Sequence, residues 1–255
     1  MIHTPAMTPT PPRLRWPLPS PLVPGRLVRR YKRFLADVVL DDGREITAHC
    51  PSPGAMTGLK DEGSRVWLVR SDDPHRKLPW SWVLATDGDV LVSFDGTSSN
   101  RYVAEAVAAG AIPELAGYAE VRREVKIEDG SRVDLYLTGH PDDPRPCWVE
   151  VKTATLGSPD GVALFPDAVT ARGLKHLDAL ATRVRAGDRA VIFYLTKRAD
   201  ARALAPADAV DPAYGEGLRA AVAAGVEALA WRADVTTEAV TLAAPLPVLL
   251  GPRSR

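Results

Sequence analysis

The sequence has little cysteine, few histidines and no excess of either charge. Cys50 and Cys147 are the only cysteines and lie far apart, so they predict neither a disulfide framework nor a cysteine-rich zinc site. No two of the five histidines have ligand spacing on one helix. This usage fits a reducing cytoplasm. Because the net charge is zero, the chain is not a generally basic nucleic-acid coat, and any such binding must come from locally clustered charge.

The N-terminal segment, residues 1–23, has no uninterrupted apolar run. Prolines interrupt it at Pro5, Pro9, Pro11, Pro12, Pro17, Pro19 and Pro21. They exclude a signal-peptide helix or a membrane span, so we expect no membrane association. The composition predicts a disordered or polyproline-like leader.

Residues 24–94 show only β signals. Runs at 35–40, 44–49, 66–69, 82–85 and 90–94 predict strands. Asp41-Asp42-Gly43 and Asp87-Gly88-Asp89 predict turns. Several short strands within about seventy residues indicate a small β-barrel or roll.

Residues 95–255 mix helices and strands, so the fold class is α/β (α+β) with two domains. Ser98 and Ser99 can cap a helix that ends at Gly110. Further helices are predicted at about 168–186 and from 212 to near 225, and strands at 121–127, 132–137, 148–154, 190–195 and 226–230. Glu128-Asp129-Gly130 makes the first strand connection a hairpin. The predicted order is α-β-β-β-α-β, followed by an α-β extension.

Three polar residues interrupt the apolar strands of this second domain. Side chains alternate between the two faces of a strand, so Asp134 points away from its apolar neighbours. Glu150 and Lys152 share one face of the next strand for the same reason. If the two strands are neighbours, Asp134, Glu150 and Lys152 converge at one place.

Two carboxylates and a lysine are the groups that metal-assisted phosphodiester hydrolysis requires. Asp134 and Glu150 supply hard oxygen ligands for Mg²⁺ or Mn²⁺, and the carbonyl of Val151 can add another. The metal polarises the phosphate and lowers the pKa of the attacking water. Lys152 can orient that water or stabilise the charge that develops on phosphorus. The competing interpretation is a solvated Glu-x-Lys ion pair on a strand.

Asp134 followed by Glu150-Val151-Lys152, within this order of elements, resembles the PD-(D/E)xK or restriction-endonuclease-like nucleases. The proline that usually precedes the aspartate is Val133 here, and that proline does no chemistry. The resemblance implies an acidic residue on the first helix that assists the metal. Glu105 is the matching candidate, and an exposed helix charge is the alternative interpretation.

A second resemblance covers residues 22–250. Its motifs are Gly25–Asp37, His49-Cys50-Pro51, Gly54-Ala55-Met56, Ser131–Asp134, Glu150–Lys152 and, most specific, Phe165–Leu177. Together they resemble the sugar fermentation stimulation protein A (SfsA) family. The resemblance implies an N-terminal OB-like barrel, a C-terminal nuclease-like domain and DNA binding. Ser52-Pro53 stands where the family usually has Asn-Thr, and Asp95 where Asn is common.

Basic residues gather at the start of the first domain. Arg13, Arg15, Arg26, Arg29, Arg30, Lys32 and Arg33 precede Asp37 with no acid among them, and Tyr31 and Phe34 lie between them. Cations meet phosphates while bases stack on rings, which suits single-stranded or distorted DNA. We therefore expect DNA as the partner. The alternative is a solvated strand edge made basic to discourage sheet-to-sheet pairing.

Thr170, Arg172 and His176 lie near the start of the predicted helix 168–186. Free N–H groups at a helix N-terminus favour phosphate. Arg172 and His176 are four residues apart and share a face, so we expect both to approach the scissile phosphate. Local packing of His176, and capping of the helix by Asp167 or Thr170, are the alternatives.

These patterns favour a cytoplasmic bacterial DNA-binding protein with metal-dependent phosphodiesterase activity. The second hypothesis, which follows from the resemblance, is a non-catalytic DNA-binding regulator of sugar (maltose-type) utilisation genes that retains a nuclease scaffold. A sugar-metabolic enzyme ranks last, because neither a glycine-rich phosphate loop nor a glycosidase carboxylate pair is identifiable. The apolar run 246–250 either finishes a sheet or covers a homodimer face.

Overall fold

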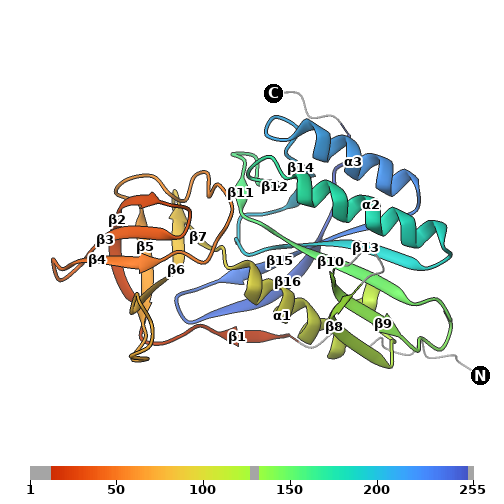
Figure 1. Ribbon diagram of the computed structural model, residues 1–255, viewed down its shortest axis with the longest axis horizontal. Helices are drawn as coiled ribbons and strands as arrows, with labels where there is room; N and C mark the ends of the chain where they lie inside the picture. The colour runs from red at the N-terminus through yellow and green to blue at the C-terminus, as the bar shows by residue number, and fades with distance from the viewer. Residues whose placement is uncertain (1–12, 127–131, 252–255) are drawn as a thin grey trace, which may run out of the picture.

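The computed structural model describes residues 13–126 and 132–251, which form a small barrel beside a larger α/β domain (Figure 1). The predicted turn at Glu128–Gly130 and residues 1–12 of the predicted leader lie outside the described residues. Within the described part of the chain, no helix is both long enough and apolar enough to cross a membrane.

The barrel has five strands: β2 (Val23–Tyr31), β3 (Leu35–Leu40), β4 (Glu45–His49), β5 (Arg65–Arg70) and β6 (Trp80–Asp87). They are hydrogen-bonded in the order β4-β3-β2-β5-β6, and parallel pairing of β4 with β6 closes the barrel. A closed five-stranded barrel with this strand order is an OB fold. Side chains of β3 alternate between buried and half-buried, and Trp82 is fully buried in the interior. β7 (Val90–Ser93) extends the sheet beside β6 and leads into the second domain.

The second domain is built on a seven-stranded sheet. Its order is β1 (Arg15–Pro17), β16 (Ala239–Leu246), β15 (Glu227–Val235), β13 (Arg189–Thr196), β10 (Cys147–Ala154), β9 (Arg132–Thr138) and β8 (Glu120–Lys126). The central strands β10, β13 and β15 are parallel, and the outer strands are antiparallel to their neighbours. β13 is almost entirely apolar because both faces of the sheet are covered there.

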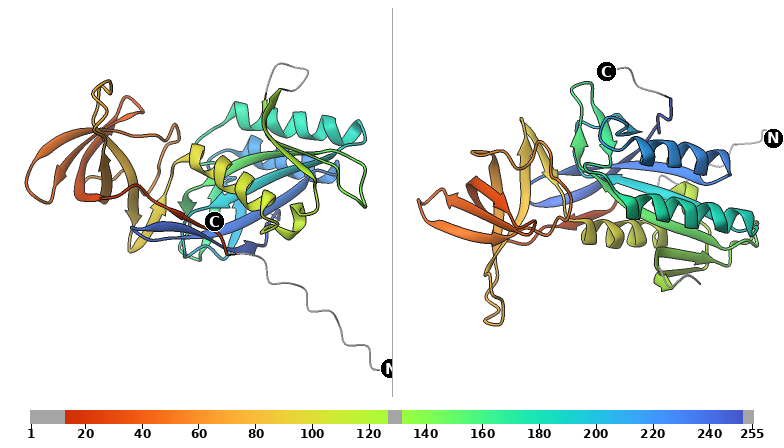
Figure 2. Two further views of the ribbon diagram at one scale, coloured as in Figure 1. Left: turned by 90° about the horizontal axis from the view of Figure 1, so that it is seen from below. Right: turned by 45° about the horizontal axis from the view of Figure 1, so that its top comes forward.

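Helices cover both faces of this sheet, as the two further views show (Figure 2). Helix α1 (Gly96–Ala108) packs on one face, and α2 (Ala171–Arg185) and α3 (Pro212–Ala223) pack on the other. A 3-10 turn at Pro113–Leu115 follows α1. The short strands β11 (Leu156–Gly157), β12 (Val162–Phe165) and β14 (Ala203–Pro206) form a separate sheet. The predicted elements therefore occur in the predicted order, to which the structure adds β11, β12, β14 and β16.

The start of α1 differs from the prediction. Asp95, not Ser98 or Ser99, caps the helix, because its carboxylate accepts a hydrogen bond from the N–H of Thr97 at 2.9 Å. The hydroxyls of Ser98 and Ser99 instead donate to the carbonyl of Asp95. Helix α1 consequently begins at Gly96.

The predicted disordered leader is wrong for residues 15–17, which form β1 at the edge of the large sheet. Trp16 is buried, its ring stacks on Tyr102 at 4.3 Å, and its Nε1 donates to Glu105 at 2.5 Å. Pro17 is tolerated because it ends an edge strand. The burial and contacts of Trp16 thus stabilise an ordered strand in a segment whose proline-rich composition predicts disorder.

The apolar C-terminal run, residues 246–250, begins at the last residue of the large sheet. Leu246 ends β16, and Leu246, Val248 and Leu250 pack against the core beneath α2 and α3. Leu246 thus ends the large sheet, and Val248 forms a bridge with Leu204 of the small sheet.

Candidate active site

The predicted acidic residues meet where two strands separate. The pairing of β9 with β10 ends at Leu135 and Val149, and the next residue on each strand is Asp134 and Glu150. The N–H of Val151 donates to Asp134 Oδ2 at 2.8 Å. Lys152 Nζ donates to Glu150 Oε1 at 2.6 Å. The structure thus brings together the three residues on which the nuclease hypothesis depends.

His176 of α2 completes this cluster. Its Nδ1 contacts Glu150 Oε1 and lies 2.9 Å from Lys152 Nζ. Arg172 Nε lies 3.3 Å from His176 Nε2. Thr170 caps α2, its Oγ1 accepting from the N–H of Gly173 at 3.0 Å. Arg172 and His176 therefore both line the cleft, whereas Thr170 caps the helix and is not among the cleft-lining residues.

The two carboxylates are both buried, but their neighbours give them different pKa values. The pKa of Asp134 is raised to about 7, first by burial and then by the charge of Glu150. Burial also acts to raise the pKa of Glu150, but the hydrogen bond with His176 and the charge of Lys152 outweigh it and lower that pKa. Carboxylates with such different pKa values inside one cleft are typical of functional sites.

Two further residues reach Asp134 that the sequence alone did not single out. Asn100 of α1 donates from Nδ2 to Asp134 Oδ1 at 2.5 Å. Glu124 of β8 lies between the residues paired with Val133 and Leu135, and so opposite Asp134. Glu124 lines the cleft with a φ of 55°, a region that non-glycine residues rarely adopt. Only the register of β8 on β9 would have identified it.

Glu105 does not reach the cluster. It accepts the Trp16 Nε1–H and is not among the cleft-lining residues, while Asn100 on the same helix faces Asp134. Five residues along an α-helix correspond to a rotation of about 140° from the starting direction, which turns Glu105 away from the carboxylates. The metal-assisting role expected for Glu105 therefore has no support in this structure.

The donor atoms suit a hard divalent cation. In residues 13–126 and 132–251, no group of three or more Asp, Glu, His and Cys side chains has metal-ligand geometry. Mg²⁺ is commonly held by one or two carboxylates and keeps several water ligands, so Asp134 and Glu150 meet its requirements. Val151 directly follows Glu150 in β10, and its backbone nitrogen lies 2.8 Å from Asp134 Oδ2.

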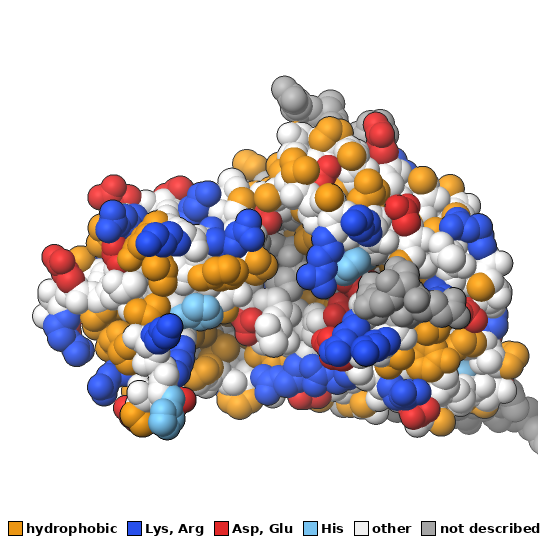
Figure 3. All heavy atoms as spheres, viewed as in Figure 1, with side chains coloured by type: hydrophobic (Ala, Val, Ile, Leu, Met, Phe, Trp, Pro, Cys, Tyr) orange, Lys and Arg blue, Asp and Glu red, His pale blue; other side chains and the backbone are white. Residues whose placement is uncertain are grey.

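The cluster opens into a cleft of 480 Å³ between the two domains. The loop 51–54 of the barrel forms one wall, and the carboxylates with Arg123 and Arg172 form the other. Lys and Arg side chains gather on both sides of the hollow between the lobes (Figure 3). A polyanion is the kind of ligand that such a rim attracts.

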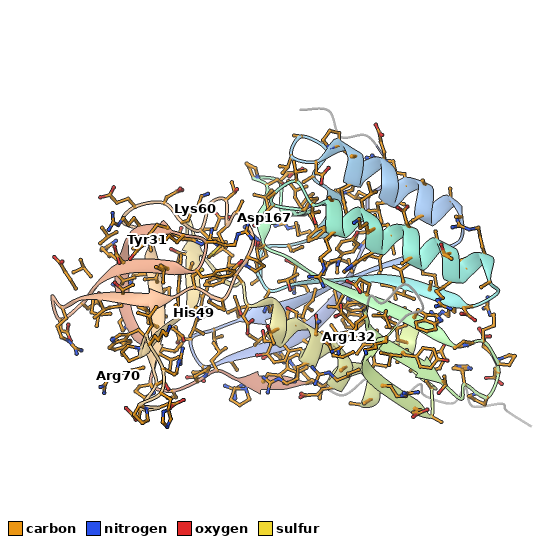
Figure 4. All side chains as sticks on the ribbon, in the orientation of Figure 1. Tyr31, His49, Lys60, Arg70, Arg132 and Asp167 are labelled. Atoms are coloured by element: carbon orange, nitrogen blue, oxygen red, sulfur yellow. The ribbon has the colours of Figure 1, made fainter. Side chains whose placement is uncertain are left out.

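The barrel loop is held against the second domain at close range. Asp167 Oδ2 accepts the N–H of Met56 at 2.8 Å, at the junction of the two domains (Figure 4). A Cβ atom on Gly54 would lie only 2.6 Å from the same oxygen, so the carboxylate can hold this position only beside glycine. From the barrel side, Arg30 donates to the carbonyl of Ser52 at 2.8 Å. Hydrogen bonds from both domains therefore hold this wall of the cleft in place.

A buried arginine also joins the domains. Arg198 is 3% exposed and donates to Asp87 Oδ2 of the barrel at 2.9 Å. Its Nε and Nη2 donate to both oxygens of Asp200 at 2.7 Å. Removing either carboxylate would leave a buried charge less well compensated.

The predicted DNA-binding residues of β2 divide into two groups. Arg26 donates to the carbonyl of Gly63, and Arg29 and the hydroxyl of Tyr31 both donate to Asp37. Lys32 and Arg33 are exposed in the turn that follows β2. Lys32 and Arg33 therefore point their charges into solvent, whereas Arg26 and Arg29 of the strand already have hydrogen-bond partners within the protein.

Comparison with known proteins agrees with this architecture. Residues 28–94 match the family model described as the SfsA N-terminal OB domain, and residues 97–239 match the sugar fermentation stimulation protein RE domain. The sugar fermentation stimulation protein homolog of Geobacter metallireducens is 53% identical, the match covering 91% of this chain and 99% of the relative. The homolog of Caulobacter vibrioides is 50% identical, over 89% of this chain and 94% of the relative.

A solved structure confirms the fold. Pyrococcus furiosus SfsA in complex with Ca²⁺ superposes with a TM-score of 0.79 and 24% identity, covering 90% of this chain and 96% of that chain. Both domains are thus matched by family models, and nearly the whole chain is matched by relatives. The chain belongs to the sugar fermentation stimulation protein (SfsA) family.

Proposed function

We propose that this protein is a Mg²⁺-dependent nuclease that hydrolyses phosphodiester bonds of DNA held in the cleft between its two domains. One observation carries the proposal: Asp134, Glu150 and Lys152 converge at the end of the β9–β10 ladder. Glu150 and Lys152 have side chains only 7% and 13% exposed, so they do not form the solvated ion pair of the competing interpretation.

The metal ligands in this proposal are Asp134, Glu150 and the carbonyl of Val151. Mn²⁺ accepts the same oxygen donors. A bound Mg²⁺ supplies Lewis-acid polarisation of the phosphate and a lowered pKa for the attacking water. The P. furiosus protein was solved with Ca²⁺, and we extend an oxygen-ligated divalent cation to this chain as part of the proposal.

The remaining residues position the phosphate and the water. The ammonium of Lys152 sits beside Glu150, where it can donate to the attacking water and stabilise charge on a phosphate oxygen. Arg172 lies at the rim, is exposed and contacts His176, so its guanidinium can bind a phosphate of the substrate. His176 holds Lys152 and Glu150 together from the side of α2.

The test is cleavage of supercoiled plasmid, linear duplex and single-stranded DNA with Mg²⁺, Mn²⁺ or EDTA. Lys152→Ala is compared with Lys60→Ala, which removes an exposed lysine of the barrel that does not line the cleft. We expect metal-dependent cleavage by the wild type and by Lys60→Ala, and none by Lys152→Ala. DNA binding by all three proteins without cleavage of any substrate would overturn the nuclease and favour the non-catalytic regulator.

A further inference from the structure

The barrel carries a second cluster of aromatic and basic side chains, separate from the carboxylates of the cleft. Phe34 and His49 stack with ring centroids 6.4 Å apart and ring planes 19° apart. His49, Arg76, Lys77 and Leu78 line a hollow of 300 Å³. Phe34 is 43% exposed, and Arg76 and Lys77 are exposed. We call Phe34, His49, Arg76 and Lys77 the stacking patch.

The stacking patch lies where an OB barrel presents its ligand face. Phe34 belongs to the turn between the first and second barrel strands, β2 and β3, and His49 ends the third, β4. Arg76 and Lys77 lie in the connection between the fourth and fifth strands, β5 and β6. OB barrels bind oligonucleotides with these two connections and with the face of their second and third strands.

The turn that carries Phe34 is held in a costly backbone conformation. Lys32 and Arg33 have φ values of 46° and 64°, in the left-handed region that favours glycine. The N–H of Cys50 donates to the carbonyl of Phe34 at 2.9 Å, next to the pairing of Leu35 with His49. The exposed ring is therefore presented by defined backbone contacts.

We propose that the stacking patch binds an unpaired base of a DNA strand on the open face of Phe34, with Arg76 and Lys77 contacting the adjoining phosphates. This inference rests on the proposed function and deepens it, because it specifies that the substrate reaches the cleft as a single strand. An exposed ring beside cations is the combination that single strands require. A duplex keeps its bases stacked on one another and offers no base face to Phe34.

The stacking patch is continuous with the catalytic cleft. His49 is followed two residues later by Pro51, the first residue of the cleft wall, so their Cα atoms lie at most about 7 Å apart. A strand that leaves the stacking patch along this loop enters the cleft beside Glu150.

The rest of the outer barrel face is less suited to phosphate. The neighbouring hollow is lined by Val28, Arg29, Asp37 and Glu45, among others. Its arginine is paired with Asp37 at 2.8 Å, and the carboxylate of Glu45 repels a phosphate. The stacking patch, which contains no carboxylate, is therefore the part of this face that takes the strand.

The test measures binding without cleavage. An oligothymidylate of about 12 nucleotides, within the site size of an OB fold, carries one 2-aminopurine and is titrated with protein in EDTA. Stacking on an aromatic ring quenches 2-aminopurine, which a purely electrostatic or structural role of Phe34 would not do. Phe34→Leu removes the ring and keeps an apolar side chain, Phe34→Tyr keeps the ring, and Leu249→Ala controls for loss of an exposed apolar residue on the other domain.

We expect quenching and tight binding with the wild type, Phe34→Tyr and Leu249→Ala. Phe34→Leu should lose the quenching and bind roughly tenfold more weakly. Arg76→Gln and Lys77→Gln should each reduce the slope of log affinity against log salt by about 1. The ribo-oligomer of the same length shows whether the strand must be DNA: equal binding would overturn that part of the proposal.

Equal affinity for the matched duplex, or unchanged quenching in Phe34→Leu, would overturn the stacking patch. Because Phe34 is exposed, its variants test binding in a folded protein, which circular dichroism verifies. Metal-dependent cleavage without 2-aminopurine quenching would contradict only the stacking patch and not the nuclease. Stacking with no metal-dependent cleavage would sink only the nuclease.

Discussion

Both domains carry exposed ion pairs, but among the described residues only the α/β domain has buried charged side chains. In the barrel, ion pairs such as Arg65–Asp41 are at the surface, with side chains 33% and 47% exposed. In the α/β domain, Glu150 and Lys152 are nearly buried, and Lys197 is completely buried. Exposed pairs cost little and contribute little, whereas buried charges carry a large desolvation penalty.

This difference suggests that the two domains have separate roles: the barrel first contacts the ligand, and the α/β domain holds the reactive groups. The exposed cations of the barrel suit the capture of a polyanion, because they remain hydrated until phosphate displaces the water. The buried cluster of the α/β domain is costly to fold, and a site that tolerates this cost is a candidate for function. Each variant below tests one side of the comparison, from the largest expected effect to the smallest.

Glu150→Gln should have the largest effect, because it removes a charge at the centre of the buried cluster and preserves its volume. We expect the rate of Mg²⁺-dependent DNA cleavage to fall by about 10²-fold or more. Cleavage rates measured across a Mg²⁺ titration check this. Cleavage at the wild-type rate would show that the buried charge is structural.

Trp16→Ala tests the segment that the composition assigned to a leader. Trp16 is buried against Tyr102 and hydrogen-bonded to Glu105, so truncation should lower the free energy of unfolding by about 3 kcal/mol. Urea denaturation of the variant and the wild type measures the loss. A change close to zero would mean that β1 contributes nothing to the sheet.

Gly54→Ala tests the junction between the two regions. Its methyl group would lie 2.6 Å from Asp167 Oδ2, so either the carboxylate must turn away from Met56 or the barrel loop must move. We expect a loss of about 1–3 kcal/mol in the free energy of unfolding and slower cleavage. Gly43→Ala is the contrasting variant, since its Cβ meets nothing within 4 Å and only its φ of 87° strains the backbone. Unchanged cleavage by Gly54→Ala would show that the loop does not shape the site.

Lys197→Met tests a buried charge outside the site. Lys197 Nζ donates to the carbonyl of Asp95 and to Ser98 Oγ, and burial lowers its pKa from 10.5 to about 7. Above pH 7 the unfolded chain therefore binds a proton that the folded lysine does not, so wild-type stability should rise between pH 7 and pH 10.5.

The methionine variant lacks this pH-dependent rise. It should be more stable than the wild type at pH 6, by about 1 kcal/mol, and less stable by pH 9, because the wild type gains about 1.4 kcal/mol for each pH unit above pH 7. The carbonyl of Asp95 keeps the hydroxyl donors Ser98 and Ser99 in the variant. Urea unfolding of both proteins at pH 6 and pH 9 measures this. If their free energies of unfolding changed equally between the two pH values, Lys197 would not have a lowered pKa.

Arg65→Ala should have the smallest effect. Its ion pair with Asp41 is short, at 2.5 Å, but lies at the surface, where water and salt screen it. We expect an unfolding midpoint unchanged within error and wild-type cleavage. A clear loss of stability would contradict the contrast between the two domains.

Much of the fold follows from local patterns. Alternation along β3 and β4, the continuous apolar run of β13 and the apolar face of α2 each predict their element, since burial of a strand or helix face depends on residues close in sequence. The same alternation placed Glu150 and Lys152 on one face. Asp134 could then be predicted to lie beside Glu150 and Lys152, provided that β9 and β10 are neighbouring strands.

Tertiary contacts decided the features that local patterns do not contain. Residues 15–17 have a leader-like composition, yet they pair with residues 239–241 more than two hundred positions away. Val133 was expected to share a face with Leu135, but it packs in the core beneath α2 while Leu135 packs beneath α1. The approach of Glu124, Asn100 and His176 to the two carboxylates likewise depends on how separate elements pack.

The sequence by itself therefore predicted the type of most main elements, though not β1 or β16, and the three residues at the centre of the candidate site. Only the tertiary structure decided that Trp16 anchors an edge strand, that Glu105 turns away, and that a barrel loop closes the cleft. The reason is physical: periodicity reports which side of one element is buried, whereas register, helix rotation and domain contact depend on free energies shared between segments far apart in the chain.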